Sequence, residues 1–250
     1  MRPCSASARA SSPATRPGGA GRWWTTRKSG RAPARCAASW PRTTAGPRGY
    51  ALFSGRERWD QDALLAEFAI EVREVVTADP AATAAIWGDL LSRDLTTEFH
   101  VPMRPVDDPL LHLLADPRRV RSRITDALWV RLVDVAGALT QRRYACPVDV
   151  VIEVADDGCS WNRGRWRLTT AGPPVPGTGA AGGFRATCER TTGPADIALP
   201  VQALGAAYLG GTRLGPMAAA GLVAELRPGT LASLSAALSW DPAPWCPMMF

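Results

Sequence analysis

Histidine and lysine are scarce in this chain of 250 residues, which has two histidines, His100 and His112, and one lysine, Lys28. The six cysteines, at positions 4, 36, 146, 159, 188 and 246, form no CxxC pair. A structural zinc site needs four Cys or His ligands at short spacing, so we expect no metal site and reduced cysteines. Neither histidine has a Ser or Cys partner in a recognisable motif, so a nucleophilic triad lacks support and both histidines are interpreted as core side chains.

Long hydrophobic runs are also lacking. No apolar stretch reaches the roughly 18 residues that span a bilayer, and the first residues lack the apolar region of a secretory signal. We therefore expect a cytoplasmic protein without a membrane partner. The content of 46% hydrophobic and 21% charged residues is typical of a globular protein. An almost purely Arg basic set with abundant Ala, Gly and Pro indicates a gene of high GC content, as in actinobacteria.

Acidic residues are absent from the first 50 positions, which carry nine Arg and one Lys, a net charge of +10. The other 200 residues have 19 basic and 23 acidic side chains, so the formal charge of +6 comes from the N-terminal part. Residues 1–47 show no helical or strand period and are predicted to be a disordered leader. A wrong reading frame or start codon is the alternative. Charge without a fold is weak support for nucleic-acid binding, so no such partner is expected.

Regular patterns begin at Arg48. Residues 78–94 predict a helix, because Asp79 can cap it, Pro80 suits its first position and Ile86 shares an apolar stripe with Leu90. A second acid-Pro helix start lies at residues 108–109. Strands are predicted at 48–53, 68–76, 96–101 and 127–135. Alternating strands and helices over about 90 residues indicate a compact α/β unit.

The rest of the chain has a different order. A helix over 135–144 precedes four short strands, at 147–154, 165–170, 184–190 and 195–201, and three helical stretches follow, at 201–210, 214–226 and 229–240. Strands followed by helices indicate an α+β domain whose sheet is covered on one side.

Three patterns could carry chemistry. "RPGGAG" at residues 16–21 fits R-x-x-G-x-G, a loop that holds the pyrophosphate of acetyl-CoA, but it lacks the preceding strand and following helix that such a loop needs. Asp107 and Asp108 could be paired catalytic carboxylates, although helix capping explains them better. Four tryptophans could line a ligand pocket or pack in a core, namely Trp161, Trp166, Trp240 and Trp245.

Six segments resemble a known family in order and spacing. They are "RPVDDPLLHLLADPRRV", "LWVRLVDVAGAL", "RRYACPVDVVIEV", "CSWNRGRWRL", "ALGAAYLGGTRL" and "WDPAPWCPMMF". Together they resemble the last two thirds of the enhanced intracellular survival family of GNAT N-acetyltransferases, over residues 48–250. The family's subunit has three parts, an N-terminal GNAT domain that binds acetyl-CoA, a second GNAT-like domain and a domain similar to sterol carrier proteins. For this chain the resemblance implies an α+β fold, with the second GNAT-like domain at 48–135 and the sterol-carrier-like domain at 136–250, after the leader at 1–47 that the composition predicts.

The resemblance also gives a meaning to the end of the chain, where three Pro and two Trp occur among residues 239–250. In the family, the terminal carboxylate of a Phe is the general base, so Phe250 is the candidate catalytic residue. Burial would raise the pKa of an α-carboxyl toward a useful range. The alternative is a C-terminal segment that only covers a sheet edge.

Two functions remain open from the sequence. In one, the chain is part of an enzyme that transfers an acetyl group from acetyl-CoA to amines of aminoglycosides, lysines or polyamines. The family's acetyl-CoA domain should precede residue 48, and 47 residues are too few for it. We therefore expect no cofactor-binding residues, no binding of acetyl-CoA and no activity by this chain alone. In the other, the sterol-carrier-like domain binds a lipid or a partner. The family implies a small-molecule amine substrate and a homo-oligomer, a hexamer.

Overall fold

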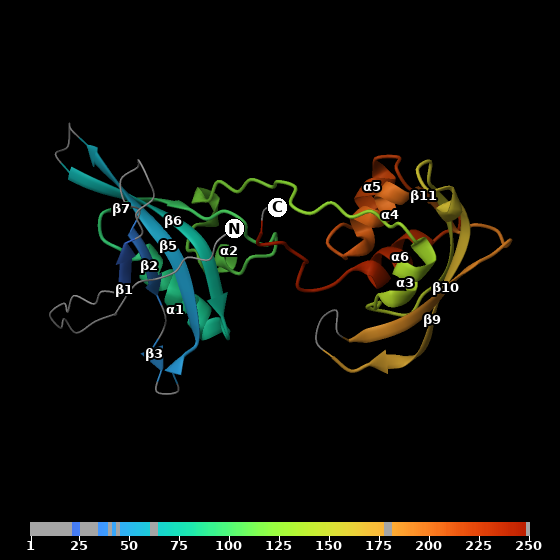
Figure 1. Ribbon diagram of the computed structural model, residues 1–250, viewed down its shortest axis with the longest axis horizontal. Helices are drawn as coiled ribbons and strands as arrows, with labels where there is room; N and C mark the ends of the chain where they lie inside the picture. Colours follow the sequence, from blue (N-terminus) through green and yellow to red (C-terminus); the bar gives the residue numbers. More distant parts are fainter. Residues whose placement is uncertain are drawn as a thin grey trace. The chain divides into compact units, whose positions relative to one another are not determined.

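The computed structural model describes residues 22–25, 35–39, 42–43, 46–60, 65–177 and 182–248. The chain divides into two compact units, Met1–Pro102 and Met103–Phe250 (Figure 1). No helix within these described ranges is long and apolar enough to cross a membrane.

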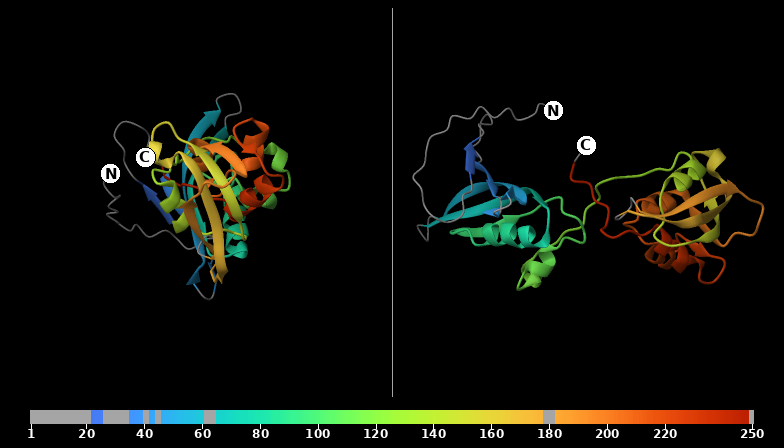
Figure 2. Two further views of the ribbon diagram at one scale, coloured as in Figure 1. Left: turned by 90° about the vertical axis from the view of Figure 1, so that its right-hand side faces the viewer. Right: turned by 90° about the horizontal axis from the view of Figure 1, so that it is seen from below.

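The described part of the first unit contains a five-stranded sheet in the order β1-β2-β5-β6-β7. The strands are β1 (Arg22–Thr25), β2 (Arg35–Ser39), β5 (Gly49–Asp60), β6 (Leu65–Thr77) and β7 (Thr96–His100). β5 and β6 form a long antiparallel hairpin, whereas β6 and β7 are parallel. Helix α1 (Pro80–Leu91) joins that parallel pair and lies against one face of the sheet (Figure 2). A short pair, β3 (Arg42–Thr43) and β4 (Gly46–Pro47), lies outside this sheet.

Helix α1 begins where the sequence predicts. The Asp79 carboxylate accepts the Ala82 N–H at 2.8 Å, and Pro80 occupies the first turn, where no N–H is needed. The buried face of the helix includes Ile86, Trp87 and Leu90, and it packs toward β5 and β6.

The second unit contains, in its described residues, a sheet in the order β10-β9-β8-β11-β12. The strands are β8 (Asp149–Ala155), β9 (Gly164–Val175), β10 (Gly183–Arg190), β11 (Ile197–Pro200) and β12 (Ala224–Glu225). The helices are α2 (Leu110–Leu113), α3 (Val135–Gln141), α4 (Val201–Tyr208), α5 (Leu214–Ala219) and α6 (Thr230–Leu238). Short 3-10 turns lie at Pro117–Arg119 and Ser160–Asn162.

One face of this second sheet carries the core. Val150, Ile152 and Val154 alternate along β8 and are buried together with Leu204 of α4 and Leu234 of α6. Figure 1 shows α3, α4, α5 and α6 gathered on one side of the sheet, as the order of strands and then helices predicts.

Two sequence predictions differ from the structure. Residues 127–135 are predicted to be a strand, but residues 121–132 form no strand, and the Trp129 side chain is 84% exposed. This prediction was wrong because alternation makes a strand only where a neighbouring strand supplies hydrogen bonds, and none of the described strands pairs with this segment. Conversely, residues 1–47 show no strand pattern, yet β1 to β4 lie there. β2 pairs along β5, a tertiary interaction that local sequence does not reveal.

Candidate functional site

Phe250, the predicted general base, lies outside the described residues. The residues that lead to it, Ser239–Met248, are described and are called the C-terminal segment here. Their contacts decide whether the end of the chain is held in place.

Trp240 anchors the start of the C-terminal segment against two glycines. A Cβ at Gly183 would lie 2.7 Å from the indole Cη2, and a Cβ at Gly210 would lie 3.1 Å from its Cδ1. Both glycines have a positive φ, +90° and +93°, which other residues rarely adopt. Trp240 therefore occupies a site that is shaped by two turns, one before β10 and one after α4.

Arg142 secures the helix that precedes the segment. Its Nη2 donates to the Leu238 carbonyl at 2.7 Å, and its Nη1 donates to the Tyr208 carbonyl. These carbonyls lie at the C-terminal ends of α6 and α4, where a cation is favourable. The guanidinium also lies 4.9 Å from the Tyr144 ring and 5.5 Å from the Tyr208 ring. Burial lowers the pKa of Arg142 from its usual value, while the two tyrosines oppose that shift.

A second set of contacts lies farther along the C-terminal segment. The Ala243 N–H donates to Asp107 Oδ2 at 2.7 Å. A Cβ at Gly211 would lie 3.1 Å from Pro244 Cγ, and the Arg104 guanidinium lies 5.9 Å from the Trp245 ring. The described part of the segment thus contacts both the α4–α5 turn and the residues before α2.

The two neighbouring acids have separate roles. Asp108 is 5% exposed, pairs with Arg104, and accepts the Leu110 N–H at 2.7 Å at the start of α2, although the N-cap position itself is Pro109 and has no side-chain cap bond. Asp107 is exposed and binds the C-terminal segment instead, so its interpretation as a cap was wrong. Capping was a reasonable prediction because the acid-Pro signal is local, whereas the bond to Ala243 crosses 136 residues of sequence.

The four candidate pocket tryptophans contact different groups. Trp166 is buried and donates to the Asn162 carbonyl, whereas Trp161 is exposed and donates to the Val133 carbonyl. Trp240 and Trp245 belong to the C-terminal segment. Both histidines are exposed, so their interpretation as core side chains was wrong. The Nε2 atom of His100 lies 3.3 Å from Oε1 of Glu98.

The N-terminus of α1 is where a strand-helix unit could hold phosphates. Here the Asp79 carboxylate already accepts the Ala82 N–H and also binds Arg48 at 2.8 Å. These contacts, led by the Ala82 N–H, hold the pKa of Asp79 below its usual value. A fixed negative charge and a first-turn Pro without an N–H oppose phosphate binding at this helix. "RPGGAG" lies outside the described residues.

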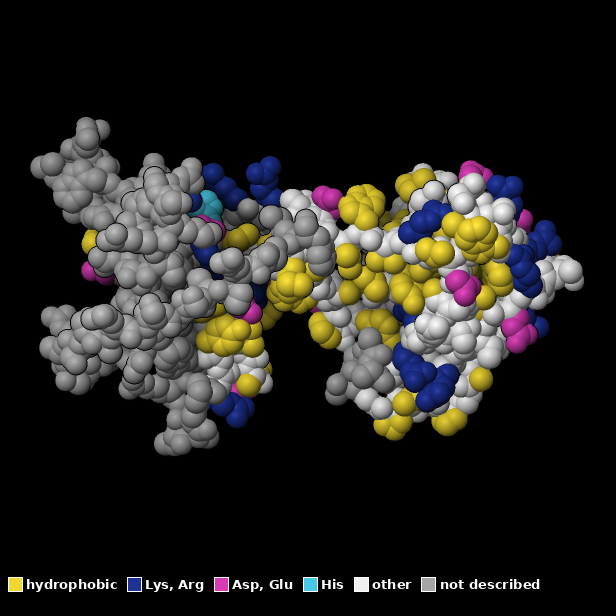
Figure 3. Space-filling view, viewed as in Figure 1, with side chains coloured by type: hydrophobic (Ala, Val, Ile, Leu, Met, Phe, Trp, Pro, Cys, Tyr) yellow, Lys and Arg dark blue, Asp and Glu magenta, His cyan; other side chains and the backbone are white. Residues whose placement is uncertain are grey.

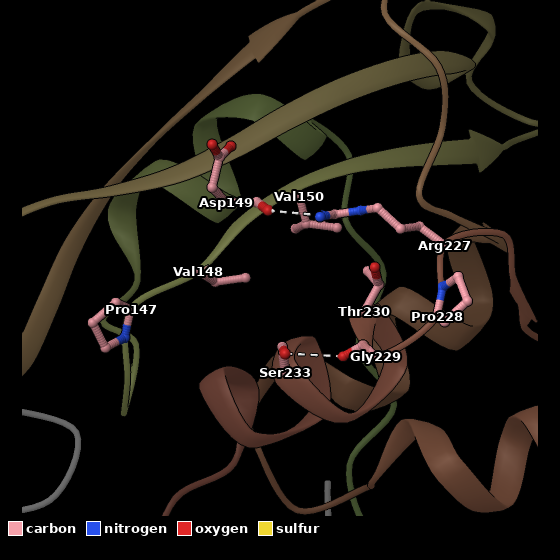
Figure 4. A pocket seen from close by; sticks show the side chains of 9 residues that line it. All are labelled: Pro147, Val148, Asp149, Val150, Arg227, Pro228, Gly229, Thr230 and Ser233. Carbon is pink, nitrogen blue, oxygen red and sulfur yellow. Dashed lines mark hydrogen bonds between the residues drawn. The ribbon is translucent and has the colours of Figure 1, made fainter.

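A cleft of about 280 Å³ opens between the start of β8 and the start of α6 (Figure 4). Its charged groups are already paired, since Arg227 binds Asp196 at 2.6 Å and Asp149 binds Arg167 at 2.8 Å. The buried Thr230 hydroxyl has no hydrogen-bond partner. Groups of three or more metal-ligating side chains were not found among the described residues. The cleft is small and has a polar rim, unlike a site for a lipid chain.

Two family models match this chain, and each covers a different part of it. Residues 18–132 match the family model "Acetyltransferase (GNAT) domain", and residues 135–247 match "Sterol carrier protein domain". The predicted fold class, a GNAT-like unit followed by a sterol-carrier-like α+β domain, is thereby confirmed.

Among curated relatives, an uncharacterized N-acetyltransferase of Streptomyces coelicolor is 46% identical over 202 residues, which is 81% of this chain and 46% of the relative. The N-acetyltransferase Eis of Mycobacterium tuberculosis is 34% identical over 199 residues, 78% of this chain and 43% of that protein. Among solved structures, Eis1 from Mycobacterium abscessus has a TM-score of 0.68 and 31% identity, and the match covers 88% of this chain and 51% of that one. The chain spans about half the length of the relatives it matches.

Proposed function

The chain belongs to the enhanced intracellular survival family of GNAT N-acetyltransferases, and we propose that it provides the C-terminal general base for acetyl transfer to an amine. GNAT enzymes take the acetyl group from acetyl-CoA. The observation that supports our proposal is the anchored C-terminal segment. A chain end that is not held in place would have neither a packing site for the Trp240 side chain nor a hydrogen bond from the Ala243 N–H to Asp107.

The role of Phe250 in this proposal is a proton transfer. A primary amine such as that of Lys has a reference pKa of about 10.4, so it is protonated at neutral pH and must lose a proton to become nucleophilic. The α-carboxylate of Phe250 accepts that proton, directly or through one water, from within hydrogen-bond reach. Such a base depends on position, which the contacts of the C-terminal segment supply.

The described residues do not fit acetyl-CoA. Asp79 fills the N-terminus of α1, the helix that follows the long strand β6, with a negative charge. We propose that this chain alone binds no acetyl-CoA and is inactive, and that a further GNAT domain supplies the cofactor. Acceptors of the expected class are amines of aminoglycosides, lysines or polyamines, and assembly into a homo-oligomer stays a prediction.

A second candidate function is binding of a partner by the sterol-carrier-like domain without catalysis. It is favoured by large apolar side chains that this domain exposes, including Trp161 at 58% and Leu222 at 56%. Figure 3 shows hydrophobic side chains on one face of the second unit. The polar cleft at α6 gives no support to a lipid ligand.

The test of the proposed function uses a restored enzyme. The 250-residue chain is joined behind the N-terminal domain that the resemblance implies for the Streptomyces coelicolor relative. Removal of Phe250 should lower kcat about 10²- to 10⁴-fold, because the new carboxylate is displaced by up to about 3.5 Å. Addition of one Gly after Phe250 should be nearly as harmful. Phe250→Leu keeps the carboxylate and should cost much less.

Two results would contradict the proposal. If the Gly extension leaves kcat within about twofold of the restored enzyme, the carboxylate is not the base. If calorimetric titration of the 250-residue chain with acetyl-CoA gives a dissociation constant in the micromolar range, the chain has a cofactor site, and "RPGGAG" becomes its first candidate.

A further inference from the structure

The segment before α2 makes a contact with the C-terminal segment that joins residues far apart in the sequence. Asp107 Oδ2 accepts the Ala243 N–H at 2.7 Å, although the two residues are 136 positions apart. Asp107 is exposed and caps no helix, so neither burial nor local structure accounts for its orientation toward the C-terminal segment.

The backbone around Asp107 is itself fixed. Its neighbour Asp108 is buried, pairs with Arg104, and accepts the Leu110 N–H. The Asp108 N–H also donates to the Pro105 carbonyl at 3.2 Å. Asp107 therefore extends from a rigid turn, and Arg104 of the same turn lies 5.9 Å from the Trp245 ring. Two residues of one turn thus contact two residues of the C-terminal segment.

The sequence around the donor limits where this bond can form. Ala243 lies between Pro242 and Pro244, which have no backbone N–H. A shift of the C-terminal segment by one residue in either direction would present a proline to Asp107 and lose the hydrogen bond. The Pro-Ala-Pro sequence and Asp107 together therefore determine the register of the segment.

The position of this contact matters for the chain end. Trp240 is ten residues from Phe250, whereas Ala243 is seven residues from it. The root-mean-square reach of a flexible chain grows as the square root of its length. Moving the last anchor from Trp240 to the Ala243–Trp245 stretch therefore confines the terminal carboxylate to a volume about two- to threefold smaller, with a matching rise in its effective concentration.

We infer that Asp107 is a positioning residue, whose hydrogen bond to Ala243 sets the register of the C-terminal segment and thereby places the Phe250 carboxylate. This inference rests on the proposed function. Asp107 acts as a hydrogen-bond acceptor and touches no reacting atom. An Asn at position 107 keeps an acceptor oxygen of the same geometry, so Asp107→Asn should preserve the placement and Asp107→Ala should abolish it.

The first experiment measures anchoring on the full 250-residue chain. Amide exchange at Ala243, followed by NMR, should become about fivefold or more faster in Asp107→Ala and stay near the original rate in Asp107→Asn. Release of Phe250 by a carboxypeptidase should follow the same order. Asp157→Ala is the matched control, because Asp157 is an exposed acid paired with Arg163, and it should leave both rates unchanged. Unchanged Ala243 exchange in Asp107→Ala would overturn the inference.

The second experiment measures kcat in the restored enzyme. Asp107→Ala should lower kcat at least about threefold with the KM for acetyl-CoA unchanged, and Asp107→Asn should restore it. A normal kcat in Asp107→Ala, in an enzyme that removal of Phe250 impairs, would overturn the positioning role and leave the proposed function standing. If removal of Phe250 also has no effect, the proposed function is wrong, and the positioning role is overturned with it.

Discussion

At the scale of single residues, the Asp156 carboxylate connects the turn after β8 to Arg131 and Asn162. This buried carboxylate accepts N–H groups of Gly158 and Cys159 at 3.0 Å each and binds Arg131 at 2.7 Å. Asn162 Nδ2 donates to Asp156 Oδ2 at 3.0 Å, while Asn162 Oδ1 accepts the Val135 N–H at the start of α3. The Asn162 bond is the largest cause that holds the pKa of Asp156 well below its usual range.

This lowered pKa predicts how stability depends on pH. The unfolded-state pKa of Asp is about 3.9, and the folded value is lower, so the stabilisation is complete above the unfolded value and is lost as the pH falls toward the folded one. Urea unfolding should therefore give a smaller free energy of unfolding at pH 3.5 than at pH 6. Asn162→Ala should be less stable at both values and should have a weaker pH dependence, and Asp157→Ala serves as the control. Equal pH dependence in Asn162→Ala and the original chain would contradict this assignment.

At the scale of elements, the turn after α4 is shaped by what packs on it. A Cβ at Gly210 would lie 2.7 Å from the Leu238 carbonyl oxygen and 3.1 Å from Trp240 Cδ1. Gly221 has a similar positive φ of +77°, but a Cβ there would meet no atom within 4 Å. We expect Gly210→Ala to lower the free energy of unfolding by about 2 kcal/mol more than Gly221→Ala, because only the first adds a collision to the backbone strain.

Chemical denaturation of the two glycine variants measures this difference. Tryptophan fluorescence is a useful second signal, since Trp240 should become more exposed in Gly210→Ala and should not change in Gly221→Ala. Equal losses of stability would mean that backbone conformation alone requires the glycine and that the site of Trp240 is not tightly packed.

At the scale of the whole molecule, the chain contains two units with separate cores. Trp87 and Ile86 are buried in the first, and Trp166 belongs to the buried cluster of the second. We expect residues 103–250 to fold alone and to keep a melting temperature within a few degrees of the corresponding transition of the full chain. Calorimetry of the full chain should show two transitions. A piece of 103–250 that lacks near-UV circular dichroism would contradict this independence.

Much of the fold follows from local patterns. The Asp79–Pro80 start of α1 and the alternation of β8 are both readable because the interactions that produce them lie within a few residues. The anchored C-terminal segment was also foreseeable in part, since several Pro and Trp residues in a chain end indicate a held conformation. The family resemblance added the role of Phe250, which stays a prediction.

The sequence by itself determined the capped helices, the alternating strands and the single donor at Ala243, because propensity, period and the missing N–H of proline are local properties. Only the tertiary structure decided that Asp107 binds Ala243, that residues 127–132 form no strand, and that β2 pairs with β5. Each of these depends on whether a partner distant in sequence lies within hydrogen-bond distance, and the folded chain alone determines that.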